Sequence, residues 1–131
     1  MPIPIIAPTW EALRREIAEK FDDNIFGTAS GGTGTTITDT GDIDRYPTTP
    51  AHLLGAEVSV VGGTGAVQSR HVTTHAKAAG TVTLTVPTWT APDTTSDYEI
   101  HNIGGRGFTK AQYDNAMNGA IYSLSDSYWT D

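Results

Sequence analysis

Four histidines are the first residues in this sequence that could do chemistry, because imidazole binds metal ions and transfers protons near neutral pH. His71 and His75 fall in one stretch that reads as a strand, and the strand rise places them about 13 Å apart. That distance is too great for two ligands of a single metal ion. A third ligand from His101 is conceivable, but no spacing supports it. We interpret these histidines as polar residues on an exposed or interfacial strand.

Two glycine-rich runs, at 31–36 and 62–65, and an acidic run, at 39–44, are the next candidates. A P-loop requires a lysine followed by serine or threonine at the start of a helix, and neither glycine-rich run has one. Asp39, Asp42 and Asp44 alternate like the ligands of a calcium loop, but the sixth-position glycine and twelfth-position glutamate of an EF-hand are missing. We expect turns at all three places, with the acids in a solvated turn.

The sequence shows no arrangement typical of an enzyme. Serine, histidine and aspartate are all present, but the Gly-x-Ser-x-Gly turn that presents a nucleophilic serine is absent. Asp22 and Asp23 could act as paired carboxylates, yet their place at a helix end explains them without catalysis. The chain has no cysteine, which excludes cysteine nucleophiles, zinc ribbons and iron–sulfur clusters. We expect a protein that is not an enzyme, with no catalytic residues, no cofactor and no metal.

The charge of the chain also restricts its partners. The net charge is -7, with only 8 lysines and arginines, whereas a protein that reads nucleic acid needs a cationic surface. We therefore expect no sequence-specific binding of DNA or RNA, although an acidic wall would let DNA slide past. The longest apolar run, in residues 3–8, is too short to cross a membrane, so we expect no membrane partner.

The composition favours one small domain that spans residues 1–131 and depends on neighbours for part of its burial. Only 37% of the residues are hydrophobic, and about one residue in six is threonine. Threonine and glycine together favour short strands joined by turns. The expected fold class is α+β, with a small antiparallel β meander or barrel-like unit bracketed by an N-terminal and a C-terminal helix.

The N-terminal part reads as an extended arm followed by an amphipathic helix. Prolines in residues 1–8 disfavour a helix and leave Ile3, Ile5 and Ile6 to dock on this domain or on a neighbouring subunit. A helix over 9–24 then begins at the N-cap Thr9. It carries an apolar stripe at helical spacing, which predicts a helix packed on a core. The stripe consists of Trp10, Leu13, Ile17 and Phe21.

The centre of the chain, residues 28–103, reads as a β module. Alternation of polar and apolar residues and the turn residues between them predict five strands. These strands are Thr35–Thr38, Ala56–Val60, Gln68–His75, Thr81–Val86 and Tyr98–Asn102. The third of them is mostly polar, so we expect it at a sheet edge or a subunit contact.

A second helix is expected over 109–126. Thr109 and Gln112 form a capping box, and Phe108 and Tyr113 form the hydrophobic staple that accompanies it. Tyr113 begins an apolar stripe that continues through Met117 along the helix, and alanines beside it would let another helix approach closely. Trp129, near the end of the chain, suggests a docking foot or a longer polypeptide.

Residues 62–70, 80–87 and 92–100 form three characteristic segments of the β module. They resemble a module of tailed-bacteriophage virion structural proteins. In those proteins a Gly-Thr-Gly-Ala-Gly-Gln-x-Arg stretch precedes a Thr-Leu-Thr-Val strand, and a Pro-Asp-x-Thr-Ser-x-Tyr-Glu-Ile stretch closes the module. Val67 departs from the usual glycine, and His71 replaces a residue that is commonly basic.

The resemblance implies a virion protein of the neck, the head–tail adaptor or the tail. The preferred function is a neck or head–tail connector component, in the virion and made in the host cytoplasm, that forms a homo-oligomeric ring around the DNA channel. Its other partners would be portal, adaptor, tail or fibre proteins. The expected subunit contacts are Ile3, Ile5, Ile6, Trp10, Leu13, Tyr113, Met117 and Trp129.

Two other functions stay open. The first is a tail-fibre, baseplate or capsid-decoration adaptor, in which the β module is a docking platform. The second is a small carbohydrate-binding domain or hydrolase that uses Trp89, Tyr98 and nearby acids. Aromatic rings can stack on sugars, but Trp89 is explained more simply as a plug over the end of the β unit.

Overall fold

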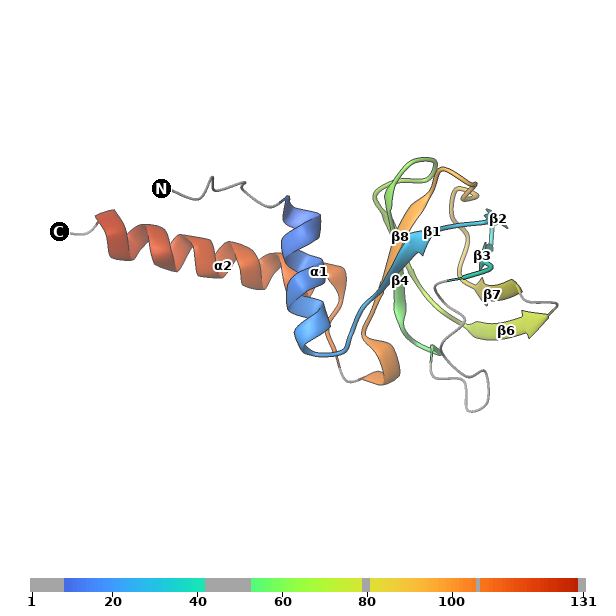
Figure 1. Cartoon of the computed structure of the whole chain (residues 1–131), viewed down its shortest axis with the longest axis horizontal. Coiled ribbons are helices and arrows are strands. Elements are labelled where there is room, and N and C mark those ends of the chain that lie inside the picture. Colours follow the sequence, from blue (N-terminus) through green and yellow to red (C-terminus); the bar gives the residue numbers. More distant parts are fainter. Residues whose placement is uncertain (1–8, 42–52, 79–80, 106, 130–131) are drawn as a thin grey trace, which may run out of the picture.

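The computed structural model describes residues 9–41, 53–78, 81–105 and 107–129 of the chain. Within these residues, two helices bracket eight strands that form two antiparallel sheets of four strands each. Figure 1 shows the helices on one side of the β unit, next to one of its sheets, with the second sheet on the far side. The predicted α+β class, with a barrel-like unit between two helices, is confirmed.

The sheet nearer the helices has the strand order β1-β8-β4-β5. Its central pair, β8 and β4, places Ile100 opposite Val58 and Glu99 opposite Ser59. The strands of this sheet are β1 (Ile25–Thr28), β4 (Glu57–Gly62), β5 (Gln68–His71) and β8 (Asp97–His101). The predicted module, 28–103, therefore begins too late, because β1 follows the first helix almost directly.

The far sheet has the strand order β2-β3-β7-β6. Its strands are β2 (Gly31–Thr33), β3 (Thr36–Asp39), β6 (Thr74–Ala78) and β7 (Thr81–Thr85). On β7, Val82 and Leu84 are buried and the threonines between them are not, as the alternation predicts. The predicted strand Gln68–His75 is two strands, β5 and β6, and each lies at the edge of its sheet.

The chain passes between the sheets at two corners, and these close the β unit. At the first corner the Ala29 amide donates to Ser96 O beside β8, while the next amide, that of Ser30, donates to Thr38 O of β3. At the second corner the Val72 amide donates to Ala56 O and the Thr73 amide to Thr85 O. Because each bent segment bonds to both sheets, the eight strands form a small barrel.

The hydrophobic core lies between the two sheets. Ile37, Leu53, Val58, Leu84 and Ile100 are fully buried there. Trp89, from the loop that precedes β8, closes the barrel: its ring is buried and its indole N–H donates to Thr33 O over 3.1 Å. The core belongs to the β unit alone, so the helices are held to it by other means.

Helix α1 spans Trp10–Lys20, which is shorter than the predicted 9–24. Thr9 caps it by accepting a hydrogen bond from the Ala12 amide, as predicted. The helix stops at the C-cap Phe21, because the next residue, Asp22, takes a positive φ of 51° that no helix continues.

Helix α1 does not pack on the barrel through its apolar stripe, so that prediction is wrong. The buried residues of the helix are Arg14 and Ala18. Trp10 and Phe21, at the two ends of the stripe, are 47% and 59% exposed. The face that meets the barrel is polar because the sheet surface beneath it is polar.

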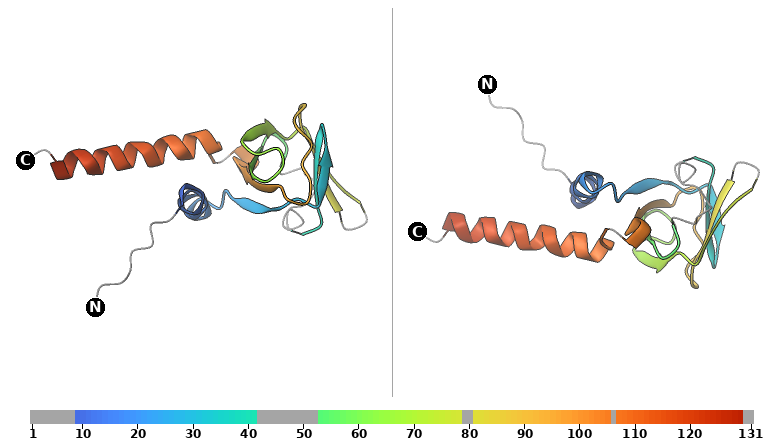
Figure 2. Two further views of the ribbon diagram at one scale, coloured as in Figure 1. Left: turned by 90° about the horizontal axis from the view of Figure 1, so that it is seen from above. Right: turned by 90° about the horizontal axis from the view of Figure 1, so that it is seen from below.

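Helix α2 spans Lys110–Trp129, three residues longer than the predicted end at 126. Its capping box is confirmed: the Gln112 amide donates to the Thr109 hydroxyl, and the Thr109 amide donates to Gln112 Oε1. Figure 2 shows, from above and from below, that α2 passes α1 near its own beginning and then extends away from the barrel. Among the described residues, neither helix has the length and apolar composition to cross a membrane.

Candidate functional site

The outer face of the helix-side sheet is polar and covered. On β8, Tyr98 and Ile100 point into the barrel core, so Glu99 and His101 alternate onto the opposite face. Both are nonetheless 0% exposed, because α1 and the start of α2 lie over them. A buried carboxylate needs strong partners, and the helices supply them.

Arg14 of α1 is the main partner of Glu99. Its Nε and Nη2 donate to the two oxygens of that carboxylate over 3.1 and 2.5 Å, and its Nη1 donates to Asp114 of α2 over 2.9 Å. His101 Nε2 lies 3.1 Å from Glu99 Oε1. Burial alone would raise the pKa of Glu99, but the hydrogen bonds and charges of His101 and Arg14 lower it to about 2. One guanidinium thus joins both helices to the sheet.

Asp23, just after α1, is a second buried junction. Its carboxylate accepts hydrogen bonds from the amides of Ile103 and Phe108 over 2.7 and 2.9 Å, and from the Tyr113 hydroxyl over 2.5 Å. Burial, followed by the hydrogen bond to Asp23 and its charge, raises the pKa of Tyr113 well above its usual value. A Cβ atom on Gly107 would lie 1.7 Å from the carboxylate, so only glycine fits there.

These junctions contain the side chains of acid–base chemistry, but they are arranged as structural bonds. The side chains of Glu99 and His101 are 0% exposed and that of Arg14 is 3% exposed, so a reactant has no access to them. Of the paired carboxylates at the end of α1, Asp22 is exposed and Asp23 is the buried member that forms one of these junctions. What the arrangement does chemically is fix the two helices relative to the barrel.

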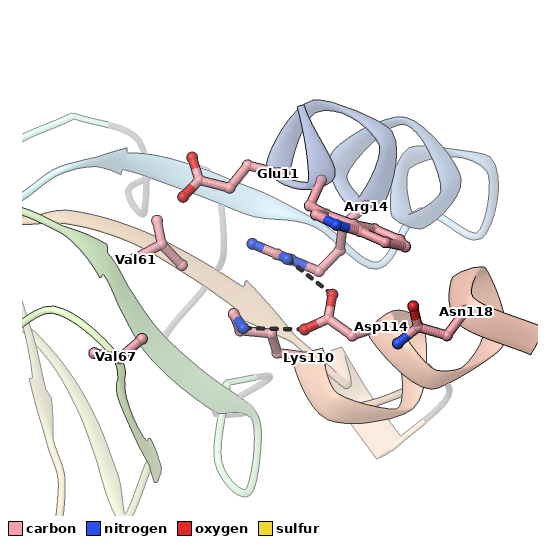
Figure 3. Close-up of a pocket in the computed structure, with 8 residues that line it drawn as sticks. Glu11, Arg14, Val61, Val67, Lys110, Asp114 and Asn118 are labelled. Carbon is pink, nitrogen blue, oxygen red and sulfur yellow. Dashed lines mark hydrogen bonds and ion pairs between the residues drawn. The ribbon is translucent and has the colours of Figure 1, made fainter. Parts of the chain in front are cut away.

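Beside the Arg14 junction lies an open pocket of about 380 Å³ (Figure 3). Glu11 comes from α1, Lys110 and Asp114 from α2, and Val61 and Val67 from β4 and the turn after it. The Lys110 ammonium donates to Asp114 over 3.0 Å, so the charges in the pocket already compensate one another. Nothing in this balance selects a charged ligand.

A groove of different character lies between α2 and the C-terminal half of α1. It has a volume of about 500 Å³, and its lining contains no charged side chain. Phe21 and Phe108 meet edge to face at its rim with ring centroids 5.8 Å apart, and they are 59% and 44% exposed. The lining residues are Ile17, Phe21, Phe108, Gln112, Tyr113, Asn115 and Ala116. We call this feature the α1–α2 groove.

The residues predicted to form subunit contacts do not lie together in the structure. Trp10 is half exposed at the pocket of Figure 3, and Leu13 is half-buried. Tyr113 and Met117 are buried at 2% and 3% exposure, so they hold α2 in place within the subunit. Ile3, Ile5 and Ile6 lie outside the described residues, and Trp129 is the last residue of α2.

The other candidate residues are placed as follows. The bend between β5 and β6 leaves His71 exposed and His75 buried, and in the described part of the chain no three His, Asp or Glu residues gather as a metal site would require. Asp39 is buried and accepts from the Tyr98 hydroxyl, so it does not lie in a solvated turn; Asp42 and Asp44 lie outside the described residues. Because Trp89 and Tyr98 are buried, neither ring is open to stack on a sugar.

Sequence reasoning missed Arg14, Asp23 and Glu99. Arg14 stands among other charged residues of a helix, and Glu99 alternates with apolar residues as a solvent-facing strand residue does. Arg14 and Glu99 are 85 residues apart in the sequence, and no local sequence pattern predicts a hydrogen bond between residues so far apart. The polar residues of this strand, Glu99 and His101, were the only local sign of a polar face that a helix could cover.

Comparisons with protein-family models, with curated proteins and with solved structures find no match to this chain. The function is therefore argued from the geometry and the sequence.

Proposed function

We propose that this protein is a structural subunit of a tailed-bacteriophage virion, in the neck or head–tail connector, where identical copies assemble into a ring around the DNA channel. It acts by assembly and not by catalysis. The observation that carries the proposal is the extension of α2 away from the rest of the subunit, together with the uncharged α1–α2 groove at its base.

Helix α2 extends well beyond α1 and the barrel (Figure 1). Its 20 residues span about 30 Å at 1.5 Å per residue, and the bonds to α1 and the barrel that its described residues make come from its first turns, at Lys110, Tyr113 and Asp114. An isolated helix of this length is marginal in water, and most helices depend on tertiary packing. The extended part of α2 therefore favours a function in which a neighbouring chain packs on it.

The buried junctions support the same proposal. Two helices packed by apolar contacts alone can slide, whereas the bidentate bond of Arg14 to Glu99 fixes both distance and orientation. A subunit that must place its contact surfaces at the same angle in every copy of a ring benefits from such a joint. The acidic net charge of -7 suits the wall of a channel that DNA passes without binding.

A second candidate, an adaptor of the tail or capsid surface, is favoured by the outer face of the far sheet. Residues that point away from the core there are threonine, alanine or glycine, without a charged side chain, in a protein rich in acids. They are Gly31, Thr33, Thr36, Thr38, Thr74, Ala76, Ala78, Thr81, Thr83 and Thr85. Interface cores are likewise depleted of charge, so this threonine face would serve as a docking platform.

The experiment is to find the protein in particles. Virions made by the virus or prophage that encodes this chain are purified and searched for it by mass spectrometry, and a gold-labelled antibody then locates it. Label at the junction of head and tail supports the neck proposal, and label at the tail tip or over the capsid supports the adaptor instead. Absence of the protein from intact virions contradicts both.

A further inference from the structure

We propose that the end of α2 from one subunit, beyond Asn118, seats in the α1–α2 groove of the next copy, so that subunits join head to tail. This inference rests on the proposed assembly function and names the contact that builds the ring. The structure describes the side chains that line the groove and the helix that continues to Trp129.

The groove calls for an apolar and uncharged occupant. None of its lining residues is charged, and the rings of Phe21 and Phe108 are about half exposed at its rim. Leaving two phenylalanine rings in water forgoes the stabilisation that a partner would provide by covering them. An acidic or basic segment would gain nothing there, since no opposite charge faces it.

The end of α2 has the matching composition. From Asn118 to Trp129 the helix contains one charged residue, Asp126, in a chain where 18% of residues are charged. After Met117, Ile121, Leu124 and Tyr128 follow at steps of four, three and four. That spacing is typical of a helix that lies in an apolar groove.

The same subunit cannot make this contact. The groove is lined by Gln112, Asn115 and Ala116 of α2 itself, and the helix runs on from there without a break to Trp129. Figures 1 and 2 show the end of α2 pointing away from α1 and the barrel in every view. The occupant must therefore come from another chain, and a second copy supplies it without any further partner.

A contact between two different surfaces has consequences for symmetry. Groove and helix end are not the same patch, so the contact is heterologous, and such contacts propagate until the rotation closes a ring. A pairing of two α2 ends would be isologous and would stop at a dimer. The two modes are separable by variants that damage one surface only.

The test uses full-length chains in solution and native mass spectrometry. Phe21→Glu places a charge in the groove, and Leu124→Glu places a charge on the end of α2. Leu54→Glu is the control, because Leu54 is 49% exposed and lies outside the groove. Each of the first two variants should weaken self-association by on the order of 100-fold or more, since a carboxylate would be buried unpaired, whereas the control should assemble like the wild type.

Mixing the two variants gives the sharpest result. The Phe21→Glu chain keeps the wild-type helix end, and the Leu124→Glu chain keeps the wild-type groove. A mixture of the two should therefore form dimers of twice 13.9 kDa that do not grow into larger species. Ala116→Trp, which fills the groove without adding charge, should replace Phe21→Glu in the mixture if that variant does not fold. Wild-type rings together with a mixture that stays monomeric would overturn this contact while sparing the assembly proposal. A monomeric wild type would overturn both.

Discussion

At the level of single residues, charged side chains join the helices to the barrel where apolar packing would be expected. Arg14 occupies the buried face of α1, and its guanidinium reaches Glu99 of the sheet and Asp114 of α2 at once. Removing one member of a buried pair leaves an uncompensated charge and costs about 3–5 kcal/mol. A joint of this kind tolerates few alternative geometries, which is the property that an assembly subunit requires.

The Glu99 junction predicts a dependence of stability on acid. The pKa of Glu99 is lowered from its usual 4.5 to about 2 in the folded protein. A lowered pKa contributes stability that is present above the unfolded value and is lost as the pH falls through the folded value. The stability difference between wild type and Glu99→Gln should therefore shrink by on the order of 2 kcal/mol from pH 5 to pH 2.

Urea unfolding at a series of pH values measures that difference. Glu16→Gln, on the exposed side of α1, serves as the control and should differ from wild type by a small and nearly constant amount. A gap between wild type and Glu99→Gln that stays constant from pH 5 to pH 2 would contradict the assignment of Glu99 as the titrating group.

The backbone conformation of Val67 predicts that a substitution at this position will stabilise the protein. Val67 has a φ of 62°, is 90% exposed, and stands where the resembling phage module has glycine. A branched side chain in the left-handed region costs about 1–2 kcal/mol, which glycine avoids. Val67→Gly should raise the free energy of unfolding by about 1 kcal/mol, after the greater unfolded-state entropy of glycine is subtracted.

Urea unfolding at neutral pH tests this substitution, with Val67→Ala as its control. Alanine removes the branch but keeps the Cβ atom, so it should recover only part of the gain. A loss of stability in Val67→Gly would show that the valine side chain contributes to the turn after β4 more than its backbone costs.

At the scale of elements, the two helices differ in how well the sequence predicts them. The start of α2 was predicted correctly because a capping box and a hydrophobic staple act within five residues. The packing of α1 was predicted wrongly. A periodic apolar stripe identifies one face of a helix, but it does not determine which surface covers that face. In this fold Arg14 and Ala18 are the residues of α1 that are buried, while Trp10 and Phe21 of the apolar stripe stay about half exposed.

The strands show the same limit. Those that alternate, such as β7, were placed to within a residue, because alternation is a local signal. The short strand β1 was missed, since Ile25, Phe26, Gly27 and Thr28 carry no such alternation between polar and apolar residues. Its pairing with β8, which joins Ile25 to Ile100 and Thr28 to Asp97, depends on the closure of the barrel. Closure is a property of the whole chain that no short segment contains.

The cap of α2 gives a prediction at this scale. Thr109→Ala removes the hydroxyl that accepts from the Gln112 amide, and it should lower the free energy of unfolding by about 1 kcal/mol. Thr109→Ser keeps that hydroxyl and should stay close to wild type. Thermal unfolding followed by circular dichroism compares the two, and equal losses in both variants would contradict the role of the cap.

At the scale of the whole molecule, the subunit has two contrasting sides. The helices, with the α1–α2 groove and the extended end of α2, lie on one side of the barrel, and the threonine face lies on the other. In the proposed assembly, such a division would let one side build the ring while the other meets a different virion protein. Both roles require that the helices keep a fixed angle to the barrel, which the Arg14 and Asp23 junctions provide.

We propose above that this chain assembles with copies of itself. The mass of the purified full-length chain, followed by sedimentation velocity over a range of concentrations, tests this most directly. We predict one predominant species at a multiple of 13.9 kDa larger than a dimer, which electron microscopy shows as a ring. A species of 13.9 kDa at every concentration would contradict the claim.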